Sequence, residues 1–216
     1  MVEPLLRVLH EDAHLLAFDK PAGLLSVPGR GPGKQDCLSA RAQAAFPGAL
    51  VVHRLDMATS GLFLMARGAA MQRALSHAFA QGQVDKRYEA VVAGDLRQPA
   101  QTADGWALID LPIAADWPRR PLRIVDAAAG KPSRTRWRVL EAAAGTTRLE
   151  LAPLTGRTHQ LRVHLQAVGH PILGDALYAP PEVQSLAPRL LLHATSLQFT
   201  HPDTGSRVAL SCSPAF

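Results

Sequence analysis

The sequence predicts an α+β fold in which a mostly antiparallel mixed sheet is flanked by helices, formed by one domain over residues 1–216. Apolar segments of strand length outnumber segments with helical periodicity. Few of the predicted helices separate consecutive strands, which disfavours a doubly wound α/β fold. No internal repeat or low-complexity tract interrupts the chain, and its length is sufficient for a sizeable core.

In the N-terminal half, apolar runs bounded by Pro and Gly predict strands, and apolar spacings of three and four predict helices. Met71, Leu75 and Phe79 form such a helical stripe, and Gly82 ends it. We predict strands over residues 5–9, 15–18, 50–52 and 62–66, and helices over residues 38–46 and 69–81.

The C-terminal half follows the same rules, except for a proline-rich segment. Residues 95–130 contain four prolines, so we predict an irregular arm there, packed against the protein by Trp106 and Trp117. Gly169 and Pro171 end a helix predicted over residues 158–168. The remaining predicted strands cover residues 87–93, 134–141, 147–151, 190–193, 197–200 and 207–210.

The composition is that of a globular protein with a mild excess of positive charge. Hydrophobic residues make up 47% and charged residues 19%, and 23 Lys and Arg against 18 Asp and Glu give a net charge of +5. This charge permits an anionic partner. Cys37 and Cys212 are too few and too far apart for a disulfide framework, which favours a reducing compartment. Without a signal peptide or a membrane-spanning run, we expect a cytoplasmic protein that does not contact a membrane.

Residues 53–61 (HRLDMATSG) form a polar cluster between two apolar strands. An aspartate in such a loop, Asp56, is well placed to be partly buried and chemically active. From these residues alone, a structural turn in which Asp56 caps backbone N–H groups near Thr59 and Ser60 is the better explanation.

Two further segments carry candidate functional residues. Arg157 lies at the start of the predicted helix, where the macrodipole disfavours a cation, and this placement suggests an anionic partner or a solvated side chain. Tyr88 follows Lys86 and Arg87 at the head of a strand, where its ring could stack on a base or fill the core. Histidine and cysteine spacings match no metal site, and no Gly-rich phosphate loop follows a strand, so we expect no metal and no cofactor.

Together these segments resemble the RluA family of RNA pseudouridine synthases. Residues 53–61 are similar to the family's aspartate motif, and they carry most of the resemblance. KRYEAVVAG (residues 86–94) resembles the tyrosine motif, and LTGRTHQLRVHLQAVGHPILGD (residues 154–175) resembles the arginine motif. DKPAGLLSVPG (residues 19–29) and LLLHATSLQF (residues 190–199) resemble the first and last motifs. Five motifs in the family's order identify the chain as a member with the family's catalytic domain.

Two stretches of the sequence resemble one branch of this family in particular. Residues 57–61 (MATSG) and 110–121 (DLPIAADWPRRP) are similar to the branch that modifies both 23S rRNA and a tRNA anticodon stem-loop. The sequence leaves no room for the N-terminal S4-type domain of many relatives, so we expect none. Recognition would then depend on the catalytic domain and the shape of an RNA hairpin.

The resemblance implies a reaction without a cofactor. The N-glycosidic bond of uridine breaks, the base turns, and it rejoins the sugar through C5, so no atoms are gained or lost. It implies that Asp56 attacks C1′ or acts as a base at the sugar 2′ carbon, and both routes remain open. Arg157 would form an ion pair with Asp56, and Tyr88 would lie against the uracil.

Weaker assignments follow for the RNA contacts. Leu192 would form an apolar wall for the base, and Arg54 would fill the gap left when the base flips out. The candidates for phosphate contacts are Lys86, Arg87, Arg162 and the loop cations Arg30 and Lys34. Each of them could equally be a solvated surface charge, and a plain surface loop is the better explanation of the loop's own composition.

Other functions predict different outcomes. A catalytically inactive RNA-binding module on the same fold would have no need of Asp56, Tyr88 and Arg157 together. A base-excision hydrolase would release free base, and a structural subunit would tolerate the loss of Asp56. We expect the protein to be a monomer.

Overall fold

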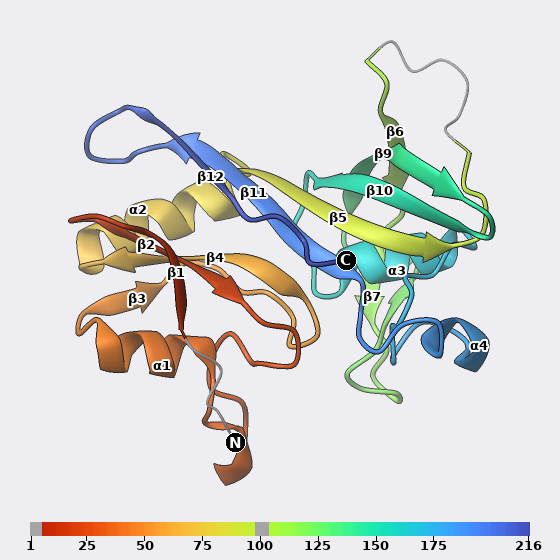
Figure 1. Cartoon of the computed structure of the whole chain (residues 1–216), viewed down its shortest axis with the longest axis horizontal. Coiled ribbons are helices and arrows are strands. Elements are labelled where there is room, and N and C mark those ends of the chain that lie inside the picture. Colours follow the sequence, from red (N-terminus) through yellow and green to blue (C-terminus); the bar gives the residue numbers. More distant parts are fainter. Residues whose placement is uncertain (1–5, 98–103) are drawn as a thin grey trace. The chain divides into compact units, whose positions relative to one another are not determined.

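The computed structural model describes residues 6–97 and 104–216, which group into two compact units (Figure 1). Unit 1 is formed by Met1–Lys86 and His193–Ala215, and unit 2 by Arg87–Leu192 with Phe216. The organisation of residues 1–216 as a single domain stays a prediction.

Unit 1 is built around the buried strand β4. Every residue from 60 to 66 in β4 is buried, which is typical of a strand covered on both faces. Its neighbours β2 and β3 are antiparallel to it, whereas β11 is parallel. β1 extends the sheet beyond β2, and β12 pairs with β11. The strands are β1 (Arg7–Glu11), β2 (Leu15–Lys20), β3 (Ala49–Val51), β4 (Ser60–Arg67), β11 (Leu192–Thr200) and β12 (Arg207–Ser211).

Two α-helices cover strands of unit 1. α1 (Leu38–Ala45) packs against β3, and α2 (Ala69–Ala80) packs against β3 and β4. The stripe on α2 contributes Met71 and Leu75 to the core, as its spacing predicts. A short 3₁₀ helix, η1 (Pro32–Lys34), lies in the Gly/Pro loop.

Unit 2 contains an antiparallel sheet in the order β5-β10-β9-β6 and a separate hairpin, β7–β8. Leu149 and Leu151 on β10 are fully buried, and α3 packs against β8 and β9. The elements are β5 (Asp85–Ala93), β6 (Ala107–Asp110), β7 (Ile113–Ala115), β8 (Arg123–Val125), β9 (Arg134–Ala143), β10 (Thr146–Pro153), α3 (Gln160–Ala167) and α4 (Pro181–Gln184).

Residues 98–103 of the irregular arm predicted over residues 95–130 lie outside the described residues, and the structure corrects the prediction for the rest of the segment. This segment contains β6, β7 and β8, each only three or four residues long and therefore too short for a periodic signal. Trp117 does not pack the arm down, because 67% of it is exposed. Trp106 is covered by the guanidinium groups of Arg87, Arg136 and Arg138. The two strands predicted over residues 190–200 form one strand, β11.

The predicted fold class is confirmed as α+β: β4 pairs antiparallel with β2 and parallel with β11, and β10 pairs antiparallel with β5 and β9. Within residues 6–97 and 104–216, no helix is both long enough and apolar enough to cross a membrane.

Candidate active site

Asp56 lies in unit 1, in the loop between β3 and β4, and its side chain is half-buried. The turn is closed by the N–H of Thr59, which donates to the backbone carbonyl of Asp56 at 3.1 Å. One residue further on, the carbonyl of Met57 accepts a hydrogen bond from the N–H of Gly23 at 2.9 Å. The backbone on both sides of Asp56 is therefore fixed.

The segment that resembles the family's first motif holds this loop from the other side. Ser26 is buried, and its hydroxyl donates to the carbonyl of Leu55 at 2.7 Å. The same hydroxyl oxygen accepts from the N–H of Leu55 at 3.1 Å. Leu55 directly precedes Asp56, so this reciprocal pair limits where the aspartate can point.

Lys20, the last residue of β2, is a functional candidate that the sequence did not reveal. Its side chain is fully buried, and its Nζ donates to the carbonyls of Pro21 (2.9 Å), Leu24 (2.7 Å) and Met57 (3.0 Å). Burial lowers the pKa of Lys20 to about 8, although the negative charge of Asp56 acts in the opposite direction. A buried cation thus interacts with Asp56 and supports its loop.

His53, at the start of the loop, has a structural position. Its Nε2 accepts a hydrogen bond from the N–H of Leu64 at 2.9 Å, and its ring stacks on Phe79 with centroids 4.5 Å apart. Burial, together with the positive charge of Lys86, lowers the pKa of His53 to about 3. The ring is therefore neutral near pH 7 and serves as an acceptor for β4.

The loop ends at a position that only glycine can occupy. Gly61 has a φ of 105°, and a Cβ there would lie 2.4 Å from the carbonyl oxygen of Ala194. The close approach results from the parallel pairing of β4 with β11.

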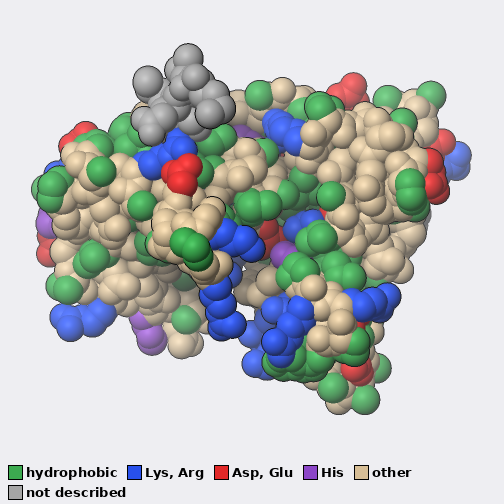
Figure 2. Space-filling model, turned by 90° about the horizontal axis from the view of Figure 1, so that it is seen from below, with side chains coloured by type: hydrophobic (Ala, Val, Ile, Leu, Met, Phe, Trp, Pro, Cys, Tyr) green, Lys and Arg blue, Asp and Glu red, His purple; other side chains and the backbone are tan. Residues whose placement is uncertain are grey.

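Arg54 lies two residues before Asp56, and its side chain is exposed. An exposed arginine is free to enter an RNA stack, so its role in base flipping stays a prediction. Arg30 and Lys34 are also exposed. Figure 2 shows Lys and Arg side chains, in blue, at several places on the viewed surface.

Tyr88 and its neighbours lie on β5 and at its start. Tyr88 is half-buried and pairs in register with Leu151 of β10. Arg87 lies over the ring of Trp106, with its Cζ 5.2 Å from the ring centroid, and its Nε is 3.6 Å from a carboxylate oxygen of Glu150. Burial lowers the pKa of Lys86. The structure therefore shows packing contacts for Arg87. The phosphate contacts of Arg87 and Lys86 stay predictions.

Arg157 lies in unit 2, in an exposed loop before α3. Its Nε donates to the carbonyl of Pro132 at 3.3 Å, and its N–H donates to Oε1 of Gln160 at 3.0 Å. The helix was expected from residue 158 but begins at Gln160, after His159 in the left-handed region with a φ of 58°. Arg157 is therefore not at the helix start, and the argument from the helix dipole does not apply to it.

Arg162 has a different environment from the one expected of a phosphate contact. Only 3% of it is exposed, and its Nε and Nη2 donate to the two carboxylate oxygens of Asp175 at 2.8 and 2.6 Å. Its guanidinium also lies over the ring of Tyr178, 5.0 Å from the centroid. A side chain so enclosed cannot reach a phosphate, and the phosphate assignment of Arg162 is corrected to a structural ion pair.

The predicted residues are divided between the two units. Asp56 and Arg54 belong to unit 1, and Tyr88, Arg157 and Leu192 belong to unit 2, where Leu192 is buried at the start of β11. The ion pair between Asp56 and Arg157 and the wall role of Leu192 stay predictions.

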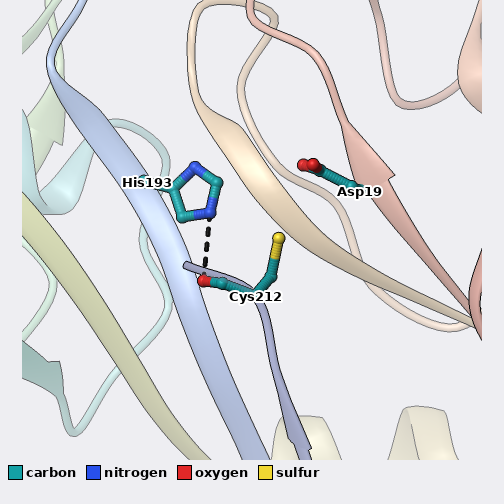
Figure 3. A group of neighbouring side chains, drawn as sticks. All are labelled: Asp19, His193 and Cys212. Atoms are coloured by element: carbon teal, nitrogen blue, oxygen red, sulfur yellow. Dashed lines mark hydrogen bonds between the residues drawn. The ribbon is translucent and has the colours of Figure 1, made fainter. Parts of the chain in front are cut away.

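Among the described residues, Asp19, His193 and Cys212 bring potential metal ligands within 4.8 Å of one another (Figure 3). Both ring nitrogens of His193 already have partners: Nε2 donates to the carbonyl of Cys212 (3.2 Å), and Nδ1 lies 2.9 Å from the Ser60 hydroxyl. Burial, reinforced by Asp19, raises the pKa of the Cys212 thiol to about 12. The hydrogen bonds of His193 account for the position of its ring in this cluster.

Solved structures share this fold. The chain aligns with Human RNA Pseudouridylate Synthase Domain Containing 1 at a TM-score of 0.77 and 28% identity, over 98% of this chain and 84% of that chain. It aligns with Human RNA Pseudouridylate Synthase Domain Containing 4 at a TM-score of 0.74 and 25% identity, over 97% of this chain and 89% of that chain. The architecture is thus that of an RNA-modifying isomerase.

Sequence comparisons identify the family. Residues 14–167 match the model of the RNA pseudouridylate synthase family. The chain is 46% identical to the dual-specificity RNA pseudouridine synthase RluA of Yersinia pestis over 97% of this chain and 99% of the relative. It is also 46% identical to the RluA of Escherichia coli K12, over 99% and 95%. The chain belongs to the RNA pseudouridylate synthase family, and the predicted family and enzyme class are confirmed.

Proposed function

We propose that the protein converts specific uridines of structured RNA into pseudouridine, in both 23S rRNA and a tRNA anticodon stem-loop. The observation that carries the proposal is the near-complete alignment with relatives named dual-specificity RNA pseudouridine synthases. The rigid loop around Asp56 supports it, because catalysis depends on a reacting group held in a fixed place.

In this proposal Asp56 is the catalytic carboxylate, either as nucleophile at C1′ or as base at the sugar 2′ carbon. Arg157 pairs with Asp56 and keeps it ionised, and Tyr88 contacts the uracil and takes part in removal of the C5 proton. Arg54 replaces the flipped base in the stack, and Leu192 lines the base pocket.

The proposal also covers the RNA phosphate contacts, the oligomeric state and the cellular compartment of the protein. The exposed cations Arg30 and Lys34 contact RNA phosphates. In this proposal Lys86 and Arg87 also contact RNA phosphates. The protein acts as a cytoplasmic monomer, which sedimentation of the free protein would test.

The proposal is tested by tritium release from RNA labelled at uridine C5, with fragments of 23S rRNA and a tRNA stem-loop as separate substrates. We expect release from both RNAs by the native protein, and a loss of at least about 10³-fold in Asp56→Asn. Glu182→Gln, at an exposed carboxylate of α4, is the matched control and should retain full activity.

Each other outcome excludes part of the proposal. Release from one RNA alone would exclude dual specificity and leave the enzyme class intact. Tight RNA binding without release from either RNA would favour an inactive binding module. Free uracil among the products would indicate a hydrolase.

A further inference from the structure

Unit 2 contains a pocket of about 600 Å³ between the β7–β8 hairpin and the loop that carries Arg157. This volume falls within the range of about 300–1,000 Å³ that is typical of small-ligand sites. Among its lining residues are the aromatic side chain of Trp117, the cations Arg123, Lys131 and Arg157, and one carboxylate, Asp126. All of these residues belong to unit 2.

The charge of the pocket favours an anion. Three cations line it against one carboxylate, and that carboxylate is engaged in its own turn. Oδ1 of Asp126 accepts the N–H groups of Ala128 and Ala129 at 2.9 Å each, and these hydrogen bonds lower the pKa of Asp126. The surplus of positive charge matches a phosphate, which binds Arg and Lys through charge-assisted hydrogen bonds.

Trp117 adds a flat apolar surface at the pocket edge. It remains 67% exposed, although burial of a tryptophan is strongly favourable. The guanidinium of Arg120 lies over one face of the ring, 3.8 Å from its centroid. An exposed indole stacked on a cation is a surface on which a nucleobase can stack.

The tip of the hairpin is held in one conformation. Asp116 is 5% exposed, its N–H donates to the carbonyl of Leu122 at 3.1 Å, and its carboxylate accepts Nε of Arg119 at 2.7 Å. Where this loop joins β8, the N–H of Arg123 donates to the hydroxyl of Tyr178 at 2.9 Å. Little conformational entropy would therefore be lost when a ligand stacks on Trp117.

We propose that this pocket binds one nucleotide of the substrate RNA next to the target uridine, with its base stacked on Trp117 and its phosphate held by Arg123 and Lys131. The inference rests on the proposed function, and it deepens that function by adding a subsite for a flanking nucleotide. Arg157 lines this pocket and is also the residue that the proposed function pairs with Asp56, so under that function the nucleotide bound here is a neighbour of the target uridine in the RNA. Any base can stack on an aromatic ring, so the subsite would bind an unpaired nucleotide with little preference among the four bases.

The first test separates binding from chemistry with a stem-loop RNA. We expect Trp117→Ala to raise KM about tenfold with kcat changed less than about twofold, and Trp117→Phe to recover most of the loss because a phenyl ring also stacks. Leu186→Ala, at another large side chain that is 60% exposed, should leave both constants unchanged. RNA should quench tryptophan fluorescence in the native protein. Trp117→Phe should remove most of this quenching, since Trp137 is only 6% exposed and three guanidinium groups lie over Trp106.

The second test concerns the phosphate. Lys131→Ala should reduce the slope of log affinity against log salt concentration by about 0.7 to 0.9, the value for one lost phosphate contact. Arg73→Ala, at an exposed cation of α2, should leave the slope unchanged. A merely structural role of Lys131 would change stability without changing the slope.

The outcomes distinguish this inference from the proposed function. If the native protein forms pseudouridine but Trp117→Ala keeps the native KM, or Lys131→Ala keeps the native slope, the subsite is wrong and the enzyme assignment stands. If the native protein forms no pseudouridine yet quenching still depends on Trp117, the proposed function fails and an RNA-binding pocket remains.

Discussion

The loop of Asp56 (residues 53–61) and the loop of Arg157 (residues 155–159) differ in how firmly each is held by its own unit. The first receives hydrogen bonds from Gly23, Ser26 and Lys20, and its flanking residues are buried. The backbone of the second is also tied, by hydrogen bonds between Arg157 and Gln160, but three consecutive residues of this loop are exposed. Its arginine side chain is exposed too and donates to a backbone carbonyl at 3.3 Å.

This difference suits the different roles that the two residues have in the proposed reaction. A carboxylate that must meet one sugar carbon benefits from being fixed before RNA binds. An arginine that must pair with that carboxylate and also face phosphates benefits from freedom to adjust. Substitutions in the fixed loop should therefore affect stability as well as rate, and substitutions in the exposed loop should affect rate alone.

The largest effect is expected behind the exposed loop, where α3 is anchored by the buried pair of Arg162 and Asp175. Arg162→Met should lower the free energy of unfolding by about 3–5 kcal/mol, because it leaves a buried carboxylate without its partner. Arg207→Met, at an arginine that is largely exposed, is the control and should change it by less than about 0.5 kcal/mol. Urea unfolding measures both. Unchanged stability with weaker RNA binding would restore the phosphate role of Arg162.

Arg157 itself should show the opposite behaviour. Arg157→Ala should reduce kcat by about 10²-fold, the usual cost of one lost charged donor in an active site. Its free energy of unfolding should change by less than about 0.5 kcal/mol, because the side chain is exposed. Arg157→Lys should fall between alanine and native in single-turnover assays. A native kcat in Arg157→Ala would exclude the ion pair with Asp56.

Substitution of Lys20 tests how far the hydrogen bonds to the Asp56 loop contribute to stability and activity. Lys20→Met keeps the side-chain volume but removes three hydrogen bonds, and should cost about 2 kcal/mol of stability along with activity. Because the pKa of Lys20 is lowered to about 8, its charge should be lost as the pH rises above 8. The native kcat should then fall with an apparent pKa near 8, and this limb should be absent from Lys20→Met. Lys34→Met, at an exposed lysine, should retain native stability and the limb.

The smallest effect is expected from His53. Its pKa is about 3 when folded and near 6.5 when unfolded, so the unfolded chain binds the proton between these values. Its contribution to stability is complete above pH 6.5 and is lost toward pH 3, at no more than about 1.4 kcal/mol per pH unit. His53→Gln should therefore show a shallower decline than native between pH 7 and 5 in urea titrations, whereas His77→Gln, at an exposed histidine, should match the native slope.

Local patterns in the sequence were sufficient for most of the fold. The stripe on α2 and the apolar run of β4 are signals carried by neighbouring residues, and both predicted elements are confirmed. The α+β class followed from such signals. The β7–β8 hairpin was missed, because strands of three residues contain too few positions to establish a period.

Side-chain environments were harder to predict, because they depend on partners far away in the chain. Lys20 ends an apolar strand like many solvated lysines, and its burial depends on the carbonyl of Met57, which is 37 residues away. Arg162 belongs to a motif rich in cations, and only the fold brings Asp175 against it. Asp56 was identified because its loop resembles a known motif, and its catalytic role stays a prediction.

The parallel pairing of β4 with β11 has a consequence for the order in which the protein is synthesised. Ser60 and Gly61, at the end of the Asp56 loop, lie beside His193 and Ala194, which are 133 residues further along the chain. A nascent chain leaves the ribosome from its N-terminus. A growing copy therefore exposes Asp56, Tyr88 and Arg157 well before the strand that completes unit 1 has been translated. We expect any RNA modification to begin only after β11 has left the ribosome and paired with β4, so shorter nascent chains should be inactive.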